Sequence, residues 1–372
     1  MIKQAVLLVG GLGTRLGERT RDVPKPLLDV AGRPFLSWLI DDLRRQGVSE
    51  ILLLAGYHGH RVIEALGAAD DIRILVEPEP LGTGGALRFA ADHLDERFFF
   101  LNGDSFFDIN LWDLAALATD GEAVLAVRPV EDASRYGRVV MDGARITGFA
   151  ERSAVPGPGL INGGVGVFSR RIVERIPPGR AVSIEAEVYP LIASARLLFG
   201  RAYASAFIDI GVPEDLERAQ RIIPQRMTRG AVILPRAALL TGSGADLRQP
   251  LTWRAGVPAA VKIVNDAGLL ALLAADDLPA DANGEENLQA LRRRMNEGLC
   301  RYGAHIDGFA GDRQTQVAVT AEARVAEPGL DAEYILLGGH PRSPGGASNR
   351  QRVVYEDAGL IGAVSKLAAE LG

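Results

Sequence analysis

The sequence predicts an α/β protein of two domains, the first of which is built on a Rossmann-like sheet. At 372 residues the chain exceeds the usual size of one hydrophobic core, so two domains are expected. Short apolar runs alternate with segments of helical periodicity along the first 225 residues, which is the pattern of strands and helices in such a sheet. A glycine-rich turn follows the first apolar run directly, at the sheet edge where this class of fold binds its ligands.

Five apolar runs in this region have the length of buried strands, and four segments between them have helical periodicity. The expected strands are Ala5–Val9, Ile51–Ala55, Ile72–Val76, Phe98–Asn102 and Val124–Val127. The expected helices are Pro34–Gln46, His60–Leu66, Gly84–Leu94 and Leu111–Ala118. From Tyr136 to Phe168, alternating strands broken by glycines predict an inserted β-rich lobe that covers a second substrate. We place the boundary after Gln225, between an N-terminal domain of residues 1–225 and a C-terminal domain of residues 226–372.

The composition is that of a well-packed globular protein, with 47% apolar and 24% charged residues. A net charge of −6 without a basic stretch argues against a nucleic-acid partner. The single cysteine, Cys300, excludes a disulfide framework and a Cys-based zinc site. No run approaches the roughly 18 apolar residues of a membrane span, and the opening run is too short for a signal peptide. We therefore expect a cytoplasmic protein without a membrane partner, whose oligomeric state, a homo-oligomer included, the sequence leaves open.

The glycine turn and a lysine beyond it together predict a phosphate site. Gly10, Gly11 and Gly13 let backbone N–H groups approach a polyphosphate, because no Cβ obstructs them. A helix beginning near Arg15 would add its dipole. The spacing matches neither a Walker A loop nor a dinucleotide fingerprint, so the turn alone could be purely structural. Lys25 lies between two prolines that fix its backbone; alone it could be an exposed loop cation.

Two aspartates follow expected strands and are candidate Mg²⁺ ligands. Asp104 comes after the apolar run that ends at Leu101, and Asp209 after Ala206–Ile208. Mg²⁺ takes hard oxygen ligands and commonly only one or two carboxylates. Either aspartate alone could instead cap a helix or form a turn.

These features resemble the signature of the sugar-phosphate nucleotidyltransferases. Its motifs recur in order: Gly10–Leu16, Pro24–Pro26, Glu79–Ala86, Leu101–Asp104, Ala150–Arg152, Leu160–Val165 and Phe207–Asp215. Within the family, the segments Leu101–Asp108 and Leu160–Val165 look especially like the D-glycero-D-manno-heptose 1-phosphate guanylyltransferase branch.

The resemblance implies a role for each matching residue. It makes Arg15 and Lys25 catalytic, and Asp104 and Asp209 the Mg²⁺ ligands. The implied nucleotide-binding residues are Gly10, Gly11, Gly13, Thr14, Gly82 and Thr83. The implied sugar-binding residues are Asn102, Glu151, Arg152, Asn162 and Gly163. Arg152 departs from the family's lysine, although an arginine can also bind phosphate.

The expected reaction joins a nucleoside monophosphate to a sugar 1-phosphate. A sugar-phosphate oxygen attacks the α-phosphorus in line and pyrophosphate leaves, so no protein nucleophile or base is needed. Catalysis then consists of positioning and charge neutralisation by Mg²⁺, Arg15 and Lys25. Glu77 and Glu79 lie in the loop before Gly82, and a glutamate there could accept the two adjacent donors of guanine, which favours GTP; a solvated loop glutamate is the alternative. We assign Glu77 to the nucleotide site.

From Gly230 onward the chain is similar to haloacid-dehalogenase-like (HAD-like) heptose bisphosphate phosphatases. Their first strand ends in two aspartates, whereas Val232–Leu234 is followed here by Pro235 and Ala237. The resemblance implies a pseudophosphatase domain. Three alternatives stay open: another sugar, such as mannose or N-acetylmuramate, or another base; a catalytically silent regulatory subunit; and an active phosphatase, which Pro235 and Ala237 oppose.

Overall fold

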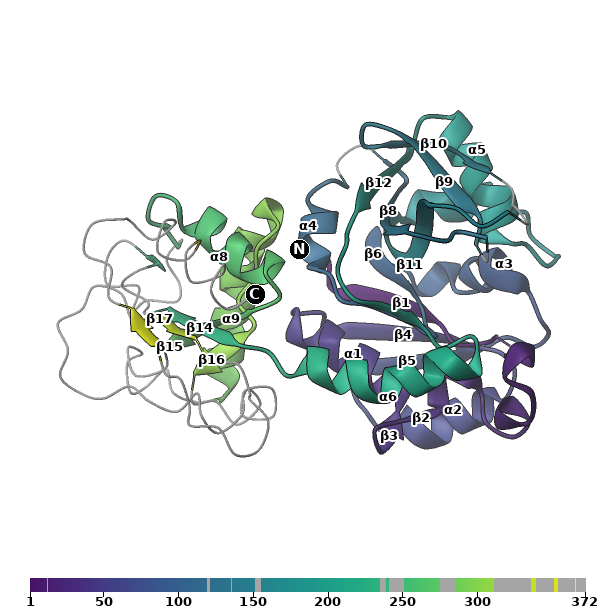
Figure 1. The fold of residues 1–372 in the computed structure, drawn as a ribbon, viewed down its shortest axis with the longest axis horizontal. Coiled ribbons are helices and arrows are strands. Elements are labelled where there is room, and N and C mark those ends of the chain that lie inside the picture. Colours follow the sequence, from purple (N-terminus) through teal and green to yellow (C-terminus); the bar gives the residue numbers. More distant parts are fainter. Residues whose placement is uncertain are drawn as a thin grey trace.

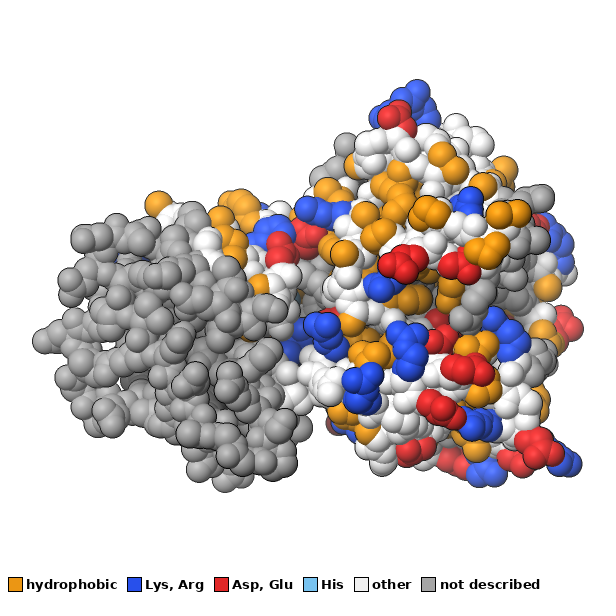
Figure 2. Space-filling model, viewed as in Figure 1, with side chains coloured by type: hydrophobic (Ala, Val, Ile, Leu, Met, Phe, Trp, Pro, Cys, Tyr) orange, Lys and Arg blue, Asp and Glu red, His pale blue; other side chains and the backbone are white. Residues whose placement is uncertain are grey.

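The computed structural model describes most of the N-terminal domain and part of the C-terminal domain. The described residues are 1–11, 13–118, 121–134, 136–150, 155–234, 239–240, 251–274, 285–310, 336–338, 351–353 and 365. Within these ranges no helix is both long and apolar enough to cross a membrane. On the face shown in Figure 2, basic and acidic side chains are interspersed over the N-terminal domain.

A nine-stranded sheet forms the centre of the N-terminal domain, with the strand order β5-β4-β1-β6-β11-β8-β12-β10-β9 (Figure 1). The first four strands of this order are mutually parallel, and β11 is antiparallel to both of its neighbours, β6 and β8. The strands are β1 (Gln4–Leu8), β4 (Glu50–Ala55), β5 (Ile72–Val76), β6 (Arg97–Asn102), β8 (Ala123–Val130), β9 (Arg138–Asp142), β10 (Arg145–Ala150), β11 (Gly159–Ser169) and β12 (Leu198–Ala202). The α/β prediction is confirmed, and the five expected strands lie within one to three residues of observed ones.

Helices cover both faces of this sheet, which explains why its central strands are continuous apolar runs. Alternate residues of β6 enter different cores: Phe99 and Leu101 pack beneath one face, and Phe98 and Phe100 beneath the other. The helices are α1 (Phe35–Arg45), α2 (Gly59–Leu66), α3 (Gly82–Phe89), α4 (Leu111–Ala115), α5 (Tyr189–Ser194) and α6 (Pro213–Met227). Shorter helical turns are η1 (Thr14–Thr20), η2 (Lys25–Leu27), η3 (Ala91–His93), η4 (Arg170–Arg175) and the π-helical η5 (Ile184–Val188).

The prediction of a separate inserted lobe was wrong. Strands β9 and β10 form a hairpin at the end of the central sheet, and β11 lies in its middle, between β6 and β8. Alternating polarity and glycines in a sequence reflect the local surroundings of a strand. They do not specify which sheet the strand joins or which strands it pairs with. Here the glycines Gly163 and Gly166 make room for the aromatic rings of Phe107 and Phe168.

Two short ladders complete the N-terminal domain. Strand β7 (Ser105–Phe107) pairs antiparallel with β13 (Phe207–Asp209), and β2 (Asp29–Val30) with β3 (Arg33–Pro34). The β7–β13 ladder matters for function, because it joins the segment after Asp104 to the segment that ends in Asp209.

The C-terminal domain has a core of its own around a parallel three-stranded sheet in the order β14-β15-β16. Helices α8 (Val257–Asp266) and α9 (Glu285–Leu299) lie in the connections between β14 (Ala231–Leu234), β15 (Leu270–Ala274) and β16 (Gly308–Ala310), with the turn η7 (Cys300–Tyr302) following α9. A further pair, β17 (Leu336–Gly338) and β18 (Gln351–Val353), is antiparallel. Pro235 and Ala237 lie outside the described residues.

The helix before the expected boundary at Gln225 continues two residues past it. Helix α6 runs through Pro224 to Met227, although proline cannot donate a helical hydrogen bond. The carbonyl of Pro224 still accepts the N–H of Thr228 at 3.0 Å, which closes the last turn.

Polar contacts join the two domains along a seam. The Asn110 amide donates to Asp266 at 2.9 Å and to the carbonyl of Gly303 at 2.8 Å. Arg45, at the end of α1, pairs with the buried Asp307 just before β16. Burial opposes the charge of Asp307, but His305 and Arg45 outweigh it and hold the pKa of Asp307 well below its usual range.

Candidate active site

The predicted glycine turn follows β1 as expected, with backbone packing tight enough to require glycine. A Cβ on Gly10 would lie 2.9 Å from the backbone nitrogen of Gly56, and Gly13 has a φ of 62°. Gly11 has open space around it. The helix expected near Arg15 is only the seven-residue 3-10 segment η1, interrupted at Gly17. The expected helix dipole is therefore small here, and a phosphate at this turn would meet mainly loop N–H groups and side chains. Thr14 opens this segment.

Lys25 is buried and not an exposed loop cation. Its side chain is 6% exposed, and its ammonium nitrogen lies 2.6 Å from Oδ2 of Asp104 and 3.2 Å from Oδ1 of Asp209. Pro24 is extended, and Lys25 itself opens the short turn η2 with Pro26 inside it. The two prolines thus set the backbone that delivers the side chain to the aspartates.

The β7–β13 ladder brings the two aspartates together across more than a hundred residues of chain. Asp209 pairs in register with Ser105, the neighbour of Asp104, and the N–H of Ile210 donates to the Asp104 carbonyl at 3.0 Å. A Cβ on Gly103 would lie 2.5 Å from the carbonyl oxygen of Leu8. This glycine therefore lets Asp104 lie against the end of β1, beside the glycine turn.

Arg15 reaches the same place. A Cβ on Gly211 would lie 3.0 Å from Oδ1 of Asp209, 3.2 Å from Nη2 of Arg15 and 3.3 Å from Nζ of Lys25. The structure thus gathers all four side chains predicted to be catalytic or metal-binding within one small region.

This cluster has the chemistry of a cation and phosphate site. Two carboxylates repel each other unless a cation lies between them, and here the ammonium of Lys25 occupies that position. Mg²⁺ commonly uses one or two carboxylates and completes its shell with water and phosphate. Among the described residues no group of three or more His, Cys, Asp or Glu side chains gathers as a metal site. The donor set fits Mg²⁺ better than a metal that needs a full protein shell.

Glu77 borders the glycine turn, whereas Glu79 is exposed. The Glu77 carboxylate accepts the N–H of Leu81 at 3.3 Å and lies against Gly56 and Gly10. Burial raises the pKa of Glu77, which the hydrogen bond from Leu81 opposes. Of the two glutamates, Glu77 is therefore the one placed to meet a bound base.

Gly82 and Thr83 are positioned by contacts with a neighbouring segment. A Cβ on Gly82 would lie 2.7 Å from the carbonyl oxygen of Val182, and Thr83 Oγ1 accepts the N–H of Ile184 at 2.8 Å. The need for glycine at position 82 is thus explained by the protein's own backbone. Nucleotide binding by Gly82 and Thr83 stays a prediction.

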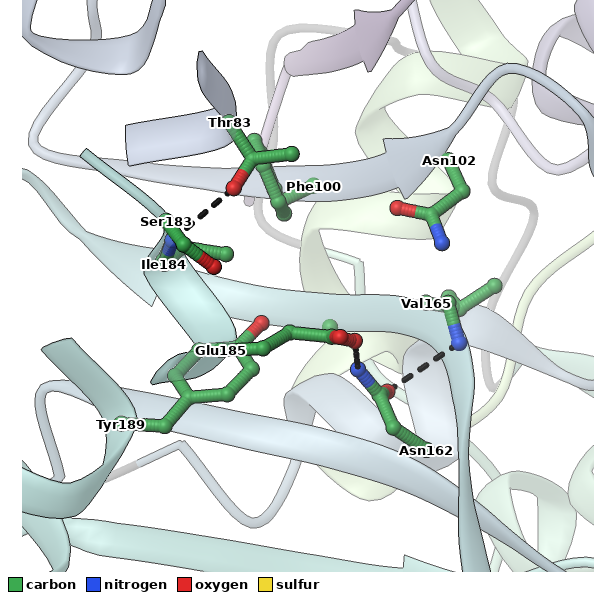
Figure 3. A pocket seen from close by; sticks show the side chains of 11 residues that line it. Thr83, Phe100, Asn102, Asn162, Val165, Ser183, Ile184, Glu185 and Tyr189 are labelled. Atoms are coloured by element: carbon green, nitrogen blue, oxygen red, sulfur yellow. Dashed lines mark hydrogen bonds between the residues drawn. The ribbon is translucent and has the colours of Figure 1, made fainter. Parts of the chain in front are cut away.

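A cavity of about 140 Å³ lies at the end of β6, where Asn102, two residues before Asp104, is part of its lining (Figure 3). It is lined by Thr83, Phe100, Asn102, Asn162, Gly164, Val165, Gly166, Ser183, Ile184, Glu185 and Tyr189. Two predicted sugar-binding residues, Asn102 and Asn162, face it. The lining glycines are Gly164 and Gly166, not Gly163. A Cβ on Gly163 would lie 2.4 Å from the ring of Phe107, so this glycine makes room for that ring. Glu151 and Arg152 lie outside the described residues.

Glu185 and Tyr189 line this cavity but were not predicted from the sequence. The Asn162 amide donates to Oε1 of Glu185 at 2.9 Å (Figure 3), and burial holds the pKa of Tyr189 well above its usual value. In the sequence Glu185 looks like an ordinary acid in a first helical turn. The signal is structural: η5 is π-helical, a form often found at functional sites, and this exposed carboxylate is turned into the cavity.

The fold and this cluster together define an α/β enzyme that handles phosphate groups at the carboxyl ends of its parallel strands. A model of the nucleotidyl transferase family matches residues 4–226. The chain therefore belongs to the nucleotidyl transferase family.

Individual relatives cover the same region. The D-glycero-alpha-D-manno-heptose 1-phosphate guanylyltransferase of Campylobacter jejuni is 35% identical over 221 residues, which cover 57% of this chain and 96% of that protein. A probable mannose-1-phosphate guanylyltransferase of Arabidopsis thaliana is 33% identical over 255 residues, 62% of this chain and 70% of that protein. The crystal structure of HddC from Yersinia pseudotuberculosis matches with a TM-score of 0.54 and 32% identity, over 59% of this chain and 98% of that one. The same protein has also been solved in complex with GMP-PN.

Proposed function

We propose that the protein transfers GMP from GTP to a sugar 1-phosphate and releases pyrophosphate. The observation that carries this proposal is the convergence of Lys25, Asp104 and Asp209 beside a cavity lined by Asn162 and Glu185. One part handles a polyphosphate and the other offers polar groups to sugar hydroxyls. The guanylyltransferase relatives support the choice of GMP.

In the proposed reaction the phosphate oxygen of the sugar 1-phosphate attacks the α-phosphorus of GTP, and the bond to the pyrophosphate oxygen breaks. The attacking oxygen is already ionised at neutral pH, so no side chain need take a proton. Lys25 and Arg15 neutralise charge on the phosphates, and the glycine turn orients them. Asp104 and Asp209 would hold Mg²⁺, which when bound offsets the charge of the phosphate oxygens.

Glu77 is proposed to select guanine. A carboxylate accepts the N1–H and the exocyclic NH₂ of guanine together, whereas adenine offers no such pair of donors. Its position against Gly10 and Gly56, at the start of the phosphate turn, supports this role.

We propose a D-glycero-D-manno-heptose 1-phosphate as the acceptor, with mannose 1-phosphate as the second candidate. Both kinds of guanylyltransferase are similar to the chain at comparable identity, 35% and 33%. Asn162 and Glu185 are the described side chains placed to bind the sugar hydroxyls, and Arg152 is proposed to bind the sugar phosphate.

The test is pyrophosphate release by the full chain with each nucleoside triphosphate combined with heptose, mannose and N-acetylmuramate 1-phosphates, with and without Mg²⁺. We expect turnover with GTP, highest with the heptose, and dependent on Mg²⁺. Turnover with another base or sugar would refute that part of the proposal. No turnover with any pair would favour the silent regulatory subunit.

For the C-terminal domain we propose a HAD-like scaffold without phosphatase activity. The strand–helix order from β14 to β16 supports an α/β scaffold, and the sequence has Pro235 and Ala237 where a nucleophile and an acid would be needed. We expect no phosphate release from heptose bisphosphate or a generic phosphomonoester by the full chain. Metal-dependent release that is lost on mutating a carboxylate of residues 226–372 would overturn this.

A further inference from the structure

A second cavity, of about 380 Å³, lies in the seam between the two domains and shares no lining residue with the active-site cavity. The N-terminal domain contributes residues 201–205, from the end of β12 onward, the loop from β7 to α4, and Arg226 near the end of α6. The C-terminal domain contributes residues 265–269 and His305, and the linker contributes Arg229. Its volume is within the range of small-molecule sites, and the proposed transferase reaction does not use it.

Apart from Oδ1 of Asp113, which forms ion pairs with Arg201 and Lys262, three side chains of this seam cavity carry buried polar atoms that have no hydrogen-bond partner in the described part of the chain. They are Nε of Arg229, Nδ1 of His305 and Oγ of Ser205. Arg229 is 8% and His305 1% exposed, so bulk water has little access to hydrogen-bond with these side chains. Buried polar groups in folded proteins are nearly always paired, and unpaired ones that line one cavity indicate a polar ligand.

The charges around the cavity indicate which ligand. Arg226 is exposed and has no acidic partner among the described residues. Arg201 shares the carboxylate of Asp113 with Lys262, at 3.0 and 2.5 Å. Guanidinium groups with spare N–H donors suit a phosphate, which accepts two of them at once.

The remaining polar groups suit hydroxyls. Ser205 and His305 can each donate or accept a hydrogen bond, and the Asp266 side chain is 43% exposed at the cavity while it pairs with Lys262. Phosphate-binding and hydroxyl-binding groups thus lie around one space of monosaccharide size. We propose that the seam cavity is a second binding site, for a phosphorylated monosaccharide.

The experiment is calorimetric titration of the full-length protein with mannose 6-phosphate as the probe. Three variants accompany the wild type: Arg226→Ala removes the unpaired guanidinium, Ala204→Trp fills the cavity from an exposed lining position, and Arg221→Ala removes a matched exposed arginine of α6 that does not line it. Asn162→Ala reports on binding in the active-site cavity.

We expect Arg226→Ala and Ala204→Trp to weaken binding by about tenfold or more, the value of one charge-assisted hydrogen bond. Arg221→Ala and Asn162→Ala should bind the probe like the wild type. Absence of binding by the wild type, or binding abolished only by Asn162→Ala, would overturn the proposal. Equal affinity for inorganic phosphate would overturn the assignment of a sugar phosphate. Because binding is measured without turnover, the result is independent of the proposed transferase reaction.

Discussion

The ammonium of Lys25 bridges Asp104 and Asp209, at 2.6 and 3.2 Å. The lysine therefore neutralises a carboxylate pair that otherwise attracts a divalent cation. The Lys25 side chain is 6% and the Asp209 side chain 17% exposed, whereas Asp104 is 36% exposed. Removing the buried ammonium therefore leaves two neighbouring carboxylates without their cation.

Lys25→Ala should lower turnover strongly and make folding stability depend on Mg²⁺. Without the ammonium, the two carboxylates face each other uncompensated, so added Mg²⁺ should raise the unfolding temperature more in this variant than in the wild type. Thermal unfolding with and without Mg²⁺ measures this, with the exposed Lys3→Ala as control. Equal shifts in all three proteins would contradict the placement of the cation.

Asp104→Asn should reduce the rate of pyrophosphate release by at least about 100-fold, which corresponds to about 3 kcal/mol of lost transition-state stabilisation. An amide cannot offset cation charge, but it keeps the shape of the side chain, so the fold should survive. Rates are compared with circular dichroism of the same samples. A folded variant with near wild-type turnover would rule out Asp104 as a metal ligand.

The preference for GTP over ATP should fall at acid pH. Burial raises the pKa of Glu77, so the carboxylate becomes protonated, and loses its ability to accept both guanine donors, at a higher pH than an exposed glutamate would. The preference for GTP over ATP should be complete above the raised pKa of Glu77. It should be lost as the pH falls through that pKa. The ratio of the GTP and ATP dissociation constants, measured across pH, follows the change. Glu77→Gln should flatten the profile, and the exposed neighbour Glu79→Gln should not; if both behave alike, Glu77 does not read the base.

Glu185→Gln should raise KM for the sugar 1-phosphate several-fold, with KM for GTP little changed. The carboxylate holds the Asn162 amide at 2.9 Å and faces the cavity, so the substitution removes an acceptor for a sugar hydroxyl; about 1–2 kcal/mol is expected. Steady-state kinetics with each substrate varied in turn gives both constants. The exposed Glu174→Gln serves as control, and an effect confined to GTP would contradict the assignment of the cavity.

Asp307→Asn should destabilise the protein by about 3 kcal/mol or more, because it leaves Arg45 buried with an incomplete set of partners. The partly exposed pair Arg44–Asp71 is a control one residue earlier on α1; Asp71→Asn should cost at most about 1 kcal/mol. Denaturant unfolding gives both values.

The same aspartate predicts an acid-labile fold. The pKa of Asp307 is lowered in the folded state, so its stabilising contribution is complete above its usual value of 3.8 and is lost as the pH falls below that value. The unfolding free energy of Asp307→Asn should therefore fall less on acidification than that of the wild type. Parallel pH profiles for the two proteins would show that Asp307 does not act as an ionised partner.

Strands could be predicted from the sequence where burial alone determines the pattern of apolar residues. Strands β1, β4 and β6 are buried on both faces and so appear as nearly uninterrupted apolar runs. Asp104 could be singled out because it comes shortly after such a run, and Asp209 because it ends the shorter run of β13. By contrast, the position of β11 in the middle of the sheet depends on pairing between distant segments, which periodicity does not encode.

Site residues were missed where local geometry departs from the regular helix. Glu185 lies on the π-helical turn η5 and lines the cavity, and the apolar pattern of the sequence does not indicate such a turn. Likewise Gly163 was assigned to the sugar, although its missing Cβ makes room for Phe107. A glycine motif predicts that another group packs closely against the backbone. It does not tell whether that group is a ligand or a side chain of the protein itself.

The β7–β13 ladder has two ends with different neighbours. One end carries the carboxylates of Asp104 and Asp209, and at the other Asp108 donates its N–H to Ala206 at 2.9 Å while its side chain is held by Arg229 of the interdomain linker at 2.5 Å. Only three paired residues separate these ends. A shift of the linker is therefore expected to alter the spacing of Asp104 and Asp209, the predicted metal ligands, so that a substitution in the C-terminal half of the chain should also be tested for its effect on the transferase half.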